Sequence, residues 1–208
     1  MCGIIGSFSK EKILDLDRLN EDRGNKAFSF AVFDDWFRLH KIFKRAGQFD
    51  ENFLKRDIYG SYFILHIQSP TKLDEIIPET IHPSTIDNIS LWHNGMVLDS
   101  CLETLKKELN ETSNWDTRII LQGLIKEGYS FLEKIEGSFA CLLYKDEKIS
   151  LFRNQIVPLY IDSELNISSA QFENSEEIDS NKIYQLDFKN KILIHVNNFV
   201  NNHNPYSF

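Results

Sequence analysis

The second residue of the chain, Cys2, has a type and a position that could do chemistry. The initiator methionine is normally removed when the next residue is small, and its removal would leave Cys2 with a free α-amine. A thiol with a pKa of about 8.5 and an α-amine with a pKa of about 7.7–8.0 would then share one residue. The thiol is a soft nucleophile, and the amine is a general base that acts directly or through a water molecule. Taken alone, a cysteine at this place is more often a small apolar residue at the start of a strand.

The other two cysteines, Cys101 and Cys141, lie in apolar stretches of the sequence. Three cysteines without a Cys-x-x-Cys spacing predict neither a disulfide framework nor a zinc site. We therefore expect Cys101 and Cys141 to be core residues with reduced thiols. No metal and no cofactor is expected, because a thiol and an amine suffice for the chemistry at Cys2.

The composition restricts the class of protein. The chain has 208 residues, of which 42% are hydrophobic, and 23 basic against 31 acidic residues give a net charge of −8. We expect one globular domain over residues 1–208. An acidic chain argues against a nucleic-acid surface, and no apolar run approaches the roughly 18–20 residues that span a bilayer. The start lacks a basic segment before a long apolar run, so we expect a cytoplasmic protein without a secretory signal.

The elements that must position Cys2 follow from the apolar pattern. Strands are predicted over 2–8, 28–33, 37–43, 62–67, 89–92, 139–144, 148–152, 159–162, 166–169, 182–188 and 192–196. Helical spacing appears over 102–109 and 117–127, in the middle of the sequence. Many strands and few helices predict a mixed, largely antiparallel sheet that is covered by helices.

Several short motifs follow one another along the chain, and their order is informative. They are Met1-Cys2-Gly3-Ile4-Ile5-Gly6, Arg23-Gly24-Asn25, His93-Asn94-Gly95, Trp115-Asp116-Thr117-Arg118, the stretch 132–144, Leu151-Phe152-Arg153-Asn154 with Pro158-Leu159-Tyr160, and Ser168 to Phe172. Together they resemble the class II glutamine amidotransferases, the N-terminal-nucleophile glutaminases. The resemblance is greatest to the glutaminase domain of asparagine synthetase-type enzymes.

The resemblance implies both a fold and a reaction. The implied fold is α+β, a four-layer α/β/β/α sandwich of the N-terminal-nucleophile hydrolases with two mainly antiparallel sheets. The implied reaction is hydrolysis of the glutamine side-chain amide, in which Cys2 forms a γ-glutamyl thioester and ammonia is released.

That reaction passes through a tetrahedral oxyanion, which needs hydrogen-bond donors. The side-chain amide of Asn94 and the backbone N–H of Gly95 can supply two donors, and the resemblance places His93 beside them in the substrate site. The alternative is structural, because Asn-Gly is also the commonest dipeptide of a type I′ hairpin turn.

A glutaminase must also bind the ammonium and the carboxylate of its substrate. Asp116 is the candidate for the ammonium, with a helix N-cap before 117–127 as the alternative. The family usually has an arginine for the carboxylate in a His-x-Arg-x-x-Thr-like stretch. Here that stretch holds Gln68 in the place of the arginine, followed by Thr71. Glutamine donates a hydrogen bond but carries no charge.

Three consequences of Gln68 are open. Another cation, such as Arg23 in the Arg23-Gly24 loop or Lys26, could bind the carboxylate; the substrate could be an amide without that carboxylate; or the site could be degenerate. The function expected is therefore a stand-alone glutamine amidotransferase that supplies ammonia to a separate synthetase-type partner. The alternatives are an N-terminal-nucleophile hydrolase of another amide, and an inactive family member that acts as a binding or regulatory subunit.

Overall fold

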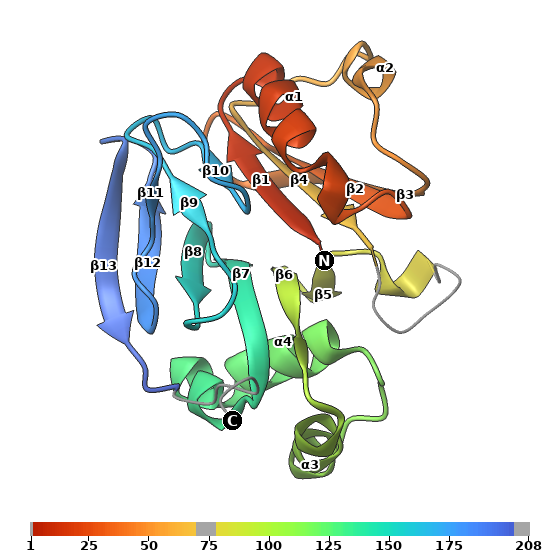
Figure 1. Cartoon of the computed structure of the whole chain (residues 1–208), viewed down its shortest axis with the longest axis vertical. Helices are drawn as coiled ribbons and strands as arrows, with labels where there is room; N and C mark the ends of the chain where they lie inside the picture. Colours follow the sequence, from red (N-terminus) through yellow and green to blue (C-terminus); the bar gives the residue numbers. More distant parts are fainter. Residues whose placement is uncertain (1, 70–77, 202–208) are drawn as a thin grey trace.

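The computed structural model describes residues 2–69 and 78–201, which form two antiparallel β-sheets (Figure 1). The first sheet consists, from edge to edge, of β11 (Glu176–Glu177), β9 (Tyr160–Ile161), β10 (Ile167–Ser168), β1 (Gly3–Ser7), β4 (Tyr62–Gln68), β2 (Ala27–Phe33) and β3 (Leu39–Ala46). The second consists of β13 (Ile192–Asn198), β12 (Lys182–Asp187), β8 (Lys148–Arg153), β7 (Gly137–Lys145), β6 (Ile89–Val97) and β5 (Ser84–Ile86).

Helices cover the outer side of each sheet. Those of the described residues are α1 (Lys10–Leu19), α2 (Glu51–Leu54), α3 (Asp99–Leu109) and α4 (Asp116–Glu127), with 3-10 helices η1 (Glu21–Arg23), η2 (Pro78–Thr80) and η3 (Gly128–Lys134). Figure 1 shows α1 and α2 beside the first sheet, and α3 and α4 beside the second. No helix in the described part of the chain is long and apolar enough to cross a membrane.

Three apolar cores separate the layers. One lies between α1, α2 and the first sheet, one between the two sheets, and one between the second sheet and α3, α4 and η3. Representative members are Ile13 and Phe53 in the first, Ile4 and Trp92 in the second, and Leu105 and Ile120 in the third. This α/β/β/α order confirms the fold class predicted from the resemblance.

The helix α1 is a correction to the predicted distribution of helices, which gathered them in the middle of the chain. Ser9 caps its N-terminus, because the Ser9 hydroxyl accepts a hydrogen bond from the Lys12 backbone N–H at 3.2 Å. Ile13 and Leu16, one helical turn apart, are buried against the first sheet. Only two apolar positions of α1 are fully buried, so the periodic signal is weak.

The strand β6 is the second correction. The dipeptide Asn94-Gly95 predicts a turn after residue 92, yet β6 continues through it to Val97 and pairs with β7. Gly95 has a φ of +148°, and a Cβ there would overlap the backbone carbonyl of Ser138. Glycine is therefore required for the close approach of β7 rather than for a turn. The predicted hairpin of β7 and β8 is confirmed by their antiparallel pairing.

Aromatic rings join the two sheets at the end of β1 that lies away from Cys2. Phe8 contacts Phe37, Tyr62 and Phe188, and the rings of Phe37 and Phe188 stack with centroids 4.1 Å apart. The ring contacts hold the far end of β1, and so help to position the end that carries Cys2.

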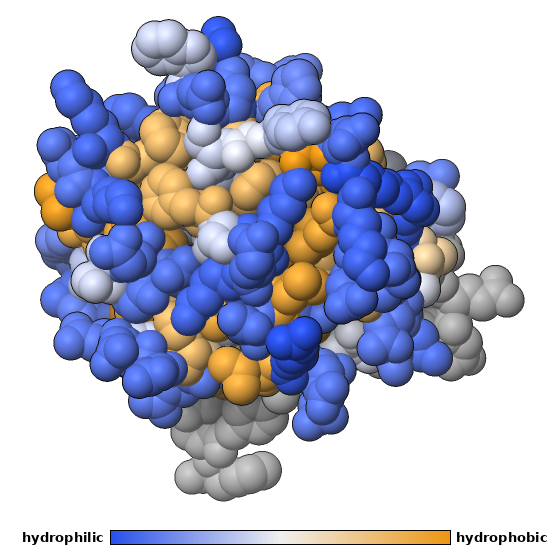
Figure 2. Space-filling model, turned by 90° about the horizontal axis from the view of Figure 1, so that it is seen from above, coloured by the Kyte–Doolittle hydropathy of each residue, from blue (hydrophilic) through white to orange (hydrophobic). Residues whose placement is uncertain are grey.

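Polar side chains cover most of the face in Figure 2, with apolar patches between them.

Candidate active site

Cys2 lies where the two sheets meet. In the antiparallel pair of β1 and β4, Gly3 lies opposite Ile67 and Ile4 opposite His66, so extending the register by one residue places Cys2 opposite Gln68. Side chains alternate along a strand, so Cys2 shares a face with Ile4, which belongs to the core between the sheets. Figure 1 shows the start of β1 close to β6.

The thiol of Cys2 is held in its protonated form. Burial raises its pKa above the ordinary value, and the negative charge of Asp116 raises the pKa further. A hydrogen bond from the Ser69 backbone acts in the opposite direction, but burial dominates. Because the thiolate is the nucleophile, a thiol in this environment needs a base to take its proton.

Asn94 is connected to the Cys2 strand through one hydroxyl group. The side chain is 1% exposed, and its Nδ2 atom lies 3.4 Å from Oγ of Ser169. The same hydroxyl accepts the backbone N–H of Ile4 at 3.0 Å. Asn94 and the adjacent Gly95 of β6 are thereby placed beside β1, as an oxyanion site for Cys2 requires.

Asp116 is brought to the same place by α4. It is the first helical residue, and the N-cap position is occupied by Trp115, whose side chain makes no capping hydrogen bond. The alternative of a plain N-cap is therefore wrong for Asp116. Its Oδ1 accepts the Thr117 N–H at 2.7 Å and its Oδ2 the Val97 N–H at 3.3 Å. The carboxylate is 21% exposed, so it can bind a cation from solvent. Its negative charge also raises the pKa of Cys2.

Gln68 is committed to contacts inside the protein. Its Oε1 lies 3.3 Å from the backbone N of His82 and 3.1 Å from Nδ1 of the same residue, and its Nε2 donates to the Thr80 carbonyl at 3.0 Å. The side chain is 4% exposed. Although Gln68 occupies the predicted position, its amide is used to hold the segment before β5.

Two buried histidines contact Thr117, and a third contacts both of them. The Thr117 hydroxyl lies 2.9 Å from Nε2 of His82 and 3.1 Å from Nδ1 of His93. His66 stacks on His82 with ring centroids 4.1 Å apart, and its Nε2 donates to the His93 carbonyl at 3.1 Å. Burial lowers the pKa of His66 to about 3 and that of His82 far below its usual range. Both rings are neutral at pH 7 and are positioning groups rather than bases.

His82 is a site residue that the sequence analysis missed. A lone His-Pro dipeptide carries no specific signal, and His82 reaches Gln68 and Thr117 only through the tertiary fold. His93 was predicted in the substrate site. Its ring contacts Thr117 and lies 3.8 Å from Oδ1 of Asp116, behind the carboxylate.

The loop of Arg23 and Gly24 lies against the end of β4. A Cβ on Gly24 would come within 2.7 Å of the Gln68 backbone, and the Lys26 N–H donates to the Gln68 carbonyl at 3.0 Å. Nη1 of Arg23 is buried and has no hydrogen-bond partner among the described residues. Burial lowers the Arg23 pKa, which still leaves a cation. Thr71, the remaining predicted residue, lies outside the described residues.

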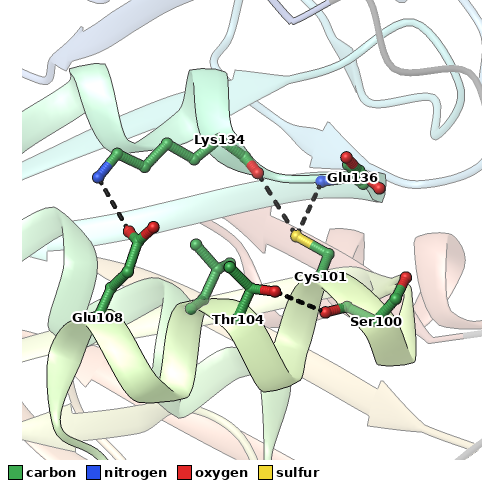
Figure 3. Close-up of a pocket in the computed structure, with 7 residues that line it drawn as sticks. Ser100, Cys101, Thr104, Glu108, Lys134 and Glu136 are labelled. Carbon is green, nitrogen blue, oxygen red and sulfur yellow. Dashed lines mark hydrogen bonds and ion pairs between the residues drawn. The ribbon is translucent and has the colours of Figure 1, made fainter.

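A separate pocket of about 350 Å³ lies beside α3 and contains Cys101 (Figure 3). Its thiol accepts the Glu136 N–H at 3.3 Å and lies 3.4 Å from the Lys134 carbonyl. Burial raises the pKa of the Cys101 thiol, so it is a weak nucleophile. Cys141 is fully buried, as predicted for a core residue. Within the described residues, no cluster of histidine, cysteine and acidic side chains could hold a metal ion.

Comparisons with known proteins agree with this fold. Residues 79–172 match the family model described as glutamine amidotransferase domain. No curated protein sequence matches the chain. The solved structure of glutamine phosphoribosylpyrophosphate amidotransferase from B. subtilis is similar, with a TM-score of 0.72 and 16% identity over 94% of this chain and 49% of that chain.

A second solved structure is described as the allosteric regulatory enzyme of purine biosynthesis. It has a TM-score of 0.67 and 15% identity, and the match covers 91% of this chain and 47% of that one. The chain therefore spans about half the length of these two proteins. Its fold is similar to that of these two proteins, one of which is an amidotransferase. Residues 79–172 carry the sequence signature of a glutamine amidotransferase domain, so the resemblance seen in the motifs is confirmed.

Proposed function

We propose that this protein hydrolyses the side-chain amide of glutamine with Cys2 as the nucleophile, and that the ammonia passes to a synthetase-type acceptor. The observation that carries the proposal is the meeting of three groups where the sheets join. Asn94 is linked through Ser169 to β1, and Asp116 acts on the Cys2 thiol, all within an amidotransferase fold.

The proposed reaction begins after removal of Met1. The α-amine of Cys2 takes the thiol proton, and the sulfur attacks the carboxamide carbon of glutamine. The oxyanion that forms accepts hydrogen bonds from the Asn94 side chain and the Gly95 N–H. The carbon–nitrogen bond breaks, the ammonium returns the proton to the leaving nitrogen, and ammonia departs from a γ-glutamyl thioester. Water gives a proton to the amine and its oxygen to the thioester carbon, which releases glutamate and restores the thiol.

The proposed substrate contacts use two charged side chains, those of Asp116 and Arg23. Asp116 binds the α-ammonium of glutamine, because its carboxylate is partly open to solvent. Arg23 binds the α-carboxylate, since its buried Nη1 has no partner among the described residues and its loop packs on Gln68. A guanidinium suits a carboxylate because it offers parallel N–H donors.

The proposed acceptor of ammonia is a synthetase-type protein that the described residues do not include. Free ammonia is mostly protonated at neutral pH and is then not a nucleophile, so direct delivery to an acceptor is the proposed route. A synthetase-type acceptor is an analogy with relatives that use ammonia in this way.

One observation favours a second candidate function, the hydrolysis of an amide without an α-carboxylate. The amide of Gln68 is occupied by His82 and Thr80, so it cannot take the role of the family arginine. Activity on simple acyl amides, with no release of glutamate from glutamine, would identify this function.

The test begins with the intact mass of the purified protein, which shows whether Met1 is removed. Glutamate and ammonia are then measured with Cys2→Ala and with Cys101→Ser as the matched control. The proposal predicts loss of activity in Cys2→Ala only, and labelling of Cys2 only by a glutamine-derived diazo-ketone. Parental turnover by Cys2→Ala would rule the proposal out, and a retained Met1 with no turnover would support the inactive, regulatory alternative.

A further inference from the structure

We infer that Ser169 is a positioning residue that orients the Asn94 amide toward the oxyanion, an inference that rests on the proposed function. Ser169 follows β10 and is fully buried. Its backbone N–H donates to the Ile4 carbonyl at 3.0 Å, and its Oγ accepts the Ile4 N–H at 3.0 Å. These two hydrogen bonds therefore fix the Ser169 hydroxyl against β1, the strand that follows Cys2.

The second contact of the Ser169 hydroxyl is the amide of Asn94. The Nδ2 atom lies 3.4 Å from Oγ, which is long for a hydrogen bond, and Oδ1 of Asn94 is buried without a partner among the described residues. The Ser169 hydroxyl accepts in both contacts, so its own hydrogen has no acceptor in the described part of the chain.

Half a turn of the Asn94 amide about its Cβ–Cγ bond gives a partner to both unpaired groups, the Oδ1 atom of Asn94 and the hydroxyl hydrogen of Ser169. The turn exchanges Nδ2 and Oδ1, which occupy nearly the same space. Oδ1 then accepts the Ser169 hydroxyl hydrogen, while the hydroxyl oxygen continues to accept the Ile4 N–H. Nδ2 is released, with both of its hydrogens available to the oxyanion.

This orientation is the one that the proposed reaction needs. An unpaired carbonyl oxygen directed at a developing oxyanion would repel it, whereas the N–H₂ group stabilises it. Ser169 favours the second arrangement, because a hydroxyl whose oxygen is already engaged by Ile4 donates best to an amide oxygen. Ser169 does not touch the substrate, and it acts through Asn94.

The adjacent Ser168 provides a matched control. It is also fully buried, and its hydroxyl accepts the Asn20 side-chain amide at 2.9 Å and the Ala170 N–H at 3.0 Å. Both serines thus anchor the same segment through two accepted hydrogen bonds, but of the two only Ser169 is hydrogen-bonded to Asn94. Ser168→Ala reports the structural cost of losing a buried hydroxyl.

The experiment compares glutaminase kinetics and thermal unfolding of Ser169→Ala, Ser169→Thr and Ser168→Ala. We expect kcat of Ser169→Ala to fall about 10- to 100-fold with KM changed less than about twofold, as for loss of an oxyanion donor. Ser169→Thr keeps the hydroxyl and recovers most of kcat. Ser168→Ala lowers the unfolding temperature as Ser169→Ala does, but keeps kcat.

A double-mutant cycle with Asn94→Ala completes the test. If Ser169 acts through Asn94, adding Ser169→Ala to Asn94→Ala lowers kcat no further. Unchanged kcat in Ser169→Ala, or an equal loss in Ser168→Ala, overturns the inference while losses in Cys2→Ala and Asn94→Ala still uphold the proposed function. If neither of those two variants loses activity, the proposed function itself fails. Should Ser169→Ala not fold, Ser169→Cys replaces it, because a thiol keeps the volume but donates weakly.

Discussion

Nδ1 of His82 lies 3.1 Å from Oε1 of Gln68, and the opposite ring nitrogen of His82 lies 2.9 Å from the Thr117 hydroxyl. Because an amide oxygen only accepts, Nδ1 of His82 carries the hydrogen and Nε2 accepts the Thr117 hydroxyl. One neutral imidazole thus connects the end of β4 with the start of α4. The candidate carboxylate position and the candidate ammonium position are held by the same ring.

Gln68→Ala is expected to destabilise the fold. The change leaves the His82 ring and the Thr80 carbonyl without the hydrogen bonds of the Gln68 amide. A loss of about 1–3 kcal/mol in the free energy of unfolding follows, because the His82 ring is buried. Urea unfolding measures the change, with the exposed Gln171→Ala as control. Equal stability of the two variants would contradict the structural role of Gln68.

Acid is expected to destabilise the protein through its buried histidines. Burial, together with the charges of His93 and Lys44, holds the pKa of His66 at about 3, whereas the unfolded chain takes up a proton near pH 6.5. Full stability is therefore present above pH 6.5 and is lost as the pH falls from there toward 3, by up to about 1.4 kcal/mol per pH unit for each such histidine.

Unfolding in urea at several pH values between 7.5 and 5 tests this expectation. His66→Gln should show a weaker pH dependence than the parent chain, because it has one fewer histidine to protonate in the unfolded state. The exposed His40→Gln should leave the dependence unchanged. The same slope in all three proteins would exclude His66 as a source.

Gly95→Ala is expected to cost at least about 2 kcal/mol of stability and to abolish glutaminase activity. The residue has a φ of +148°, and a Cβ would overlap the Ser138 carbonyl, so β6 and β7 must separate where Asn94 is placed. Gly47→Ala is the control, since Gly47 has a φ of +98° but nothing within 4 Å of a Cβ. It carries the conformational cost alone, about 1 kcal/mol.

Asp116→Asn is expected to separate substrate binding from thiol reactivity. Loss of the carboxylate charge removes one cause of the raised pKa of Cys2, so alkylation of Cys2 by iodoacetamide becomes faster near pH 7. At the same time KM for glutamine rises at least about tenfold, because a partly buried ion pair with the substrate ammonium is lost. Mass spectrometry of alkylated Cys2 and steady-state kinetics measure both effects, with the exposed Asp87→Asn as control. Slower alkylation would contradict the electrostatic coupling of Asp116 and Cys2.

Local patterns were sufficient for much of the fold. The apolar runs of β1, β2 and β4 and the periodic residues of α3 and α4 lie close to the predicted positions, because each buries a face that its own sequence marks. The motifs also predicted Cys2, Asn94 and Asp116 as candidate site residues, and these stay predictions. The turn predicted at Asn94-Gly95 was wrong, because the turn signal of the dipeptide and its use for close strand approach look alike in sequence.

The sequence by itself determined the class of fold and the candidates for the reactive groups, since both depend on residue types in order along the chain. Tertiary structure alone decided that Gln68 is occupied by His82, and that Ser169 links Asn94 to Ile4. These pairs are 14, 75 and 165 positions apart. Hydrogen bonds between residues so distant depend on how the two sheets pack, and no local pattern encodes that packing.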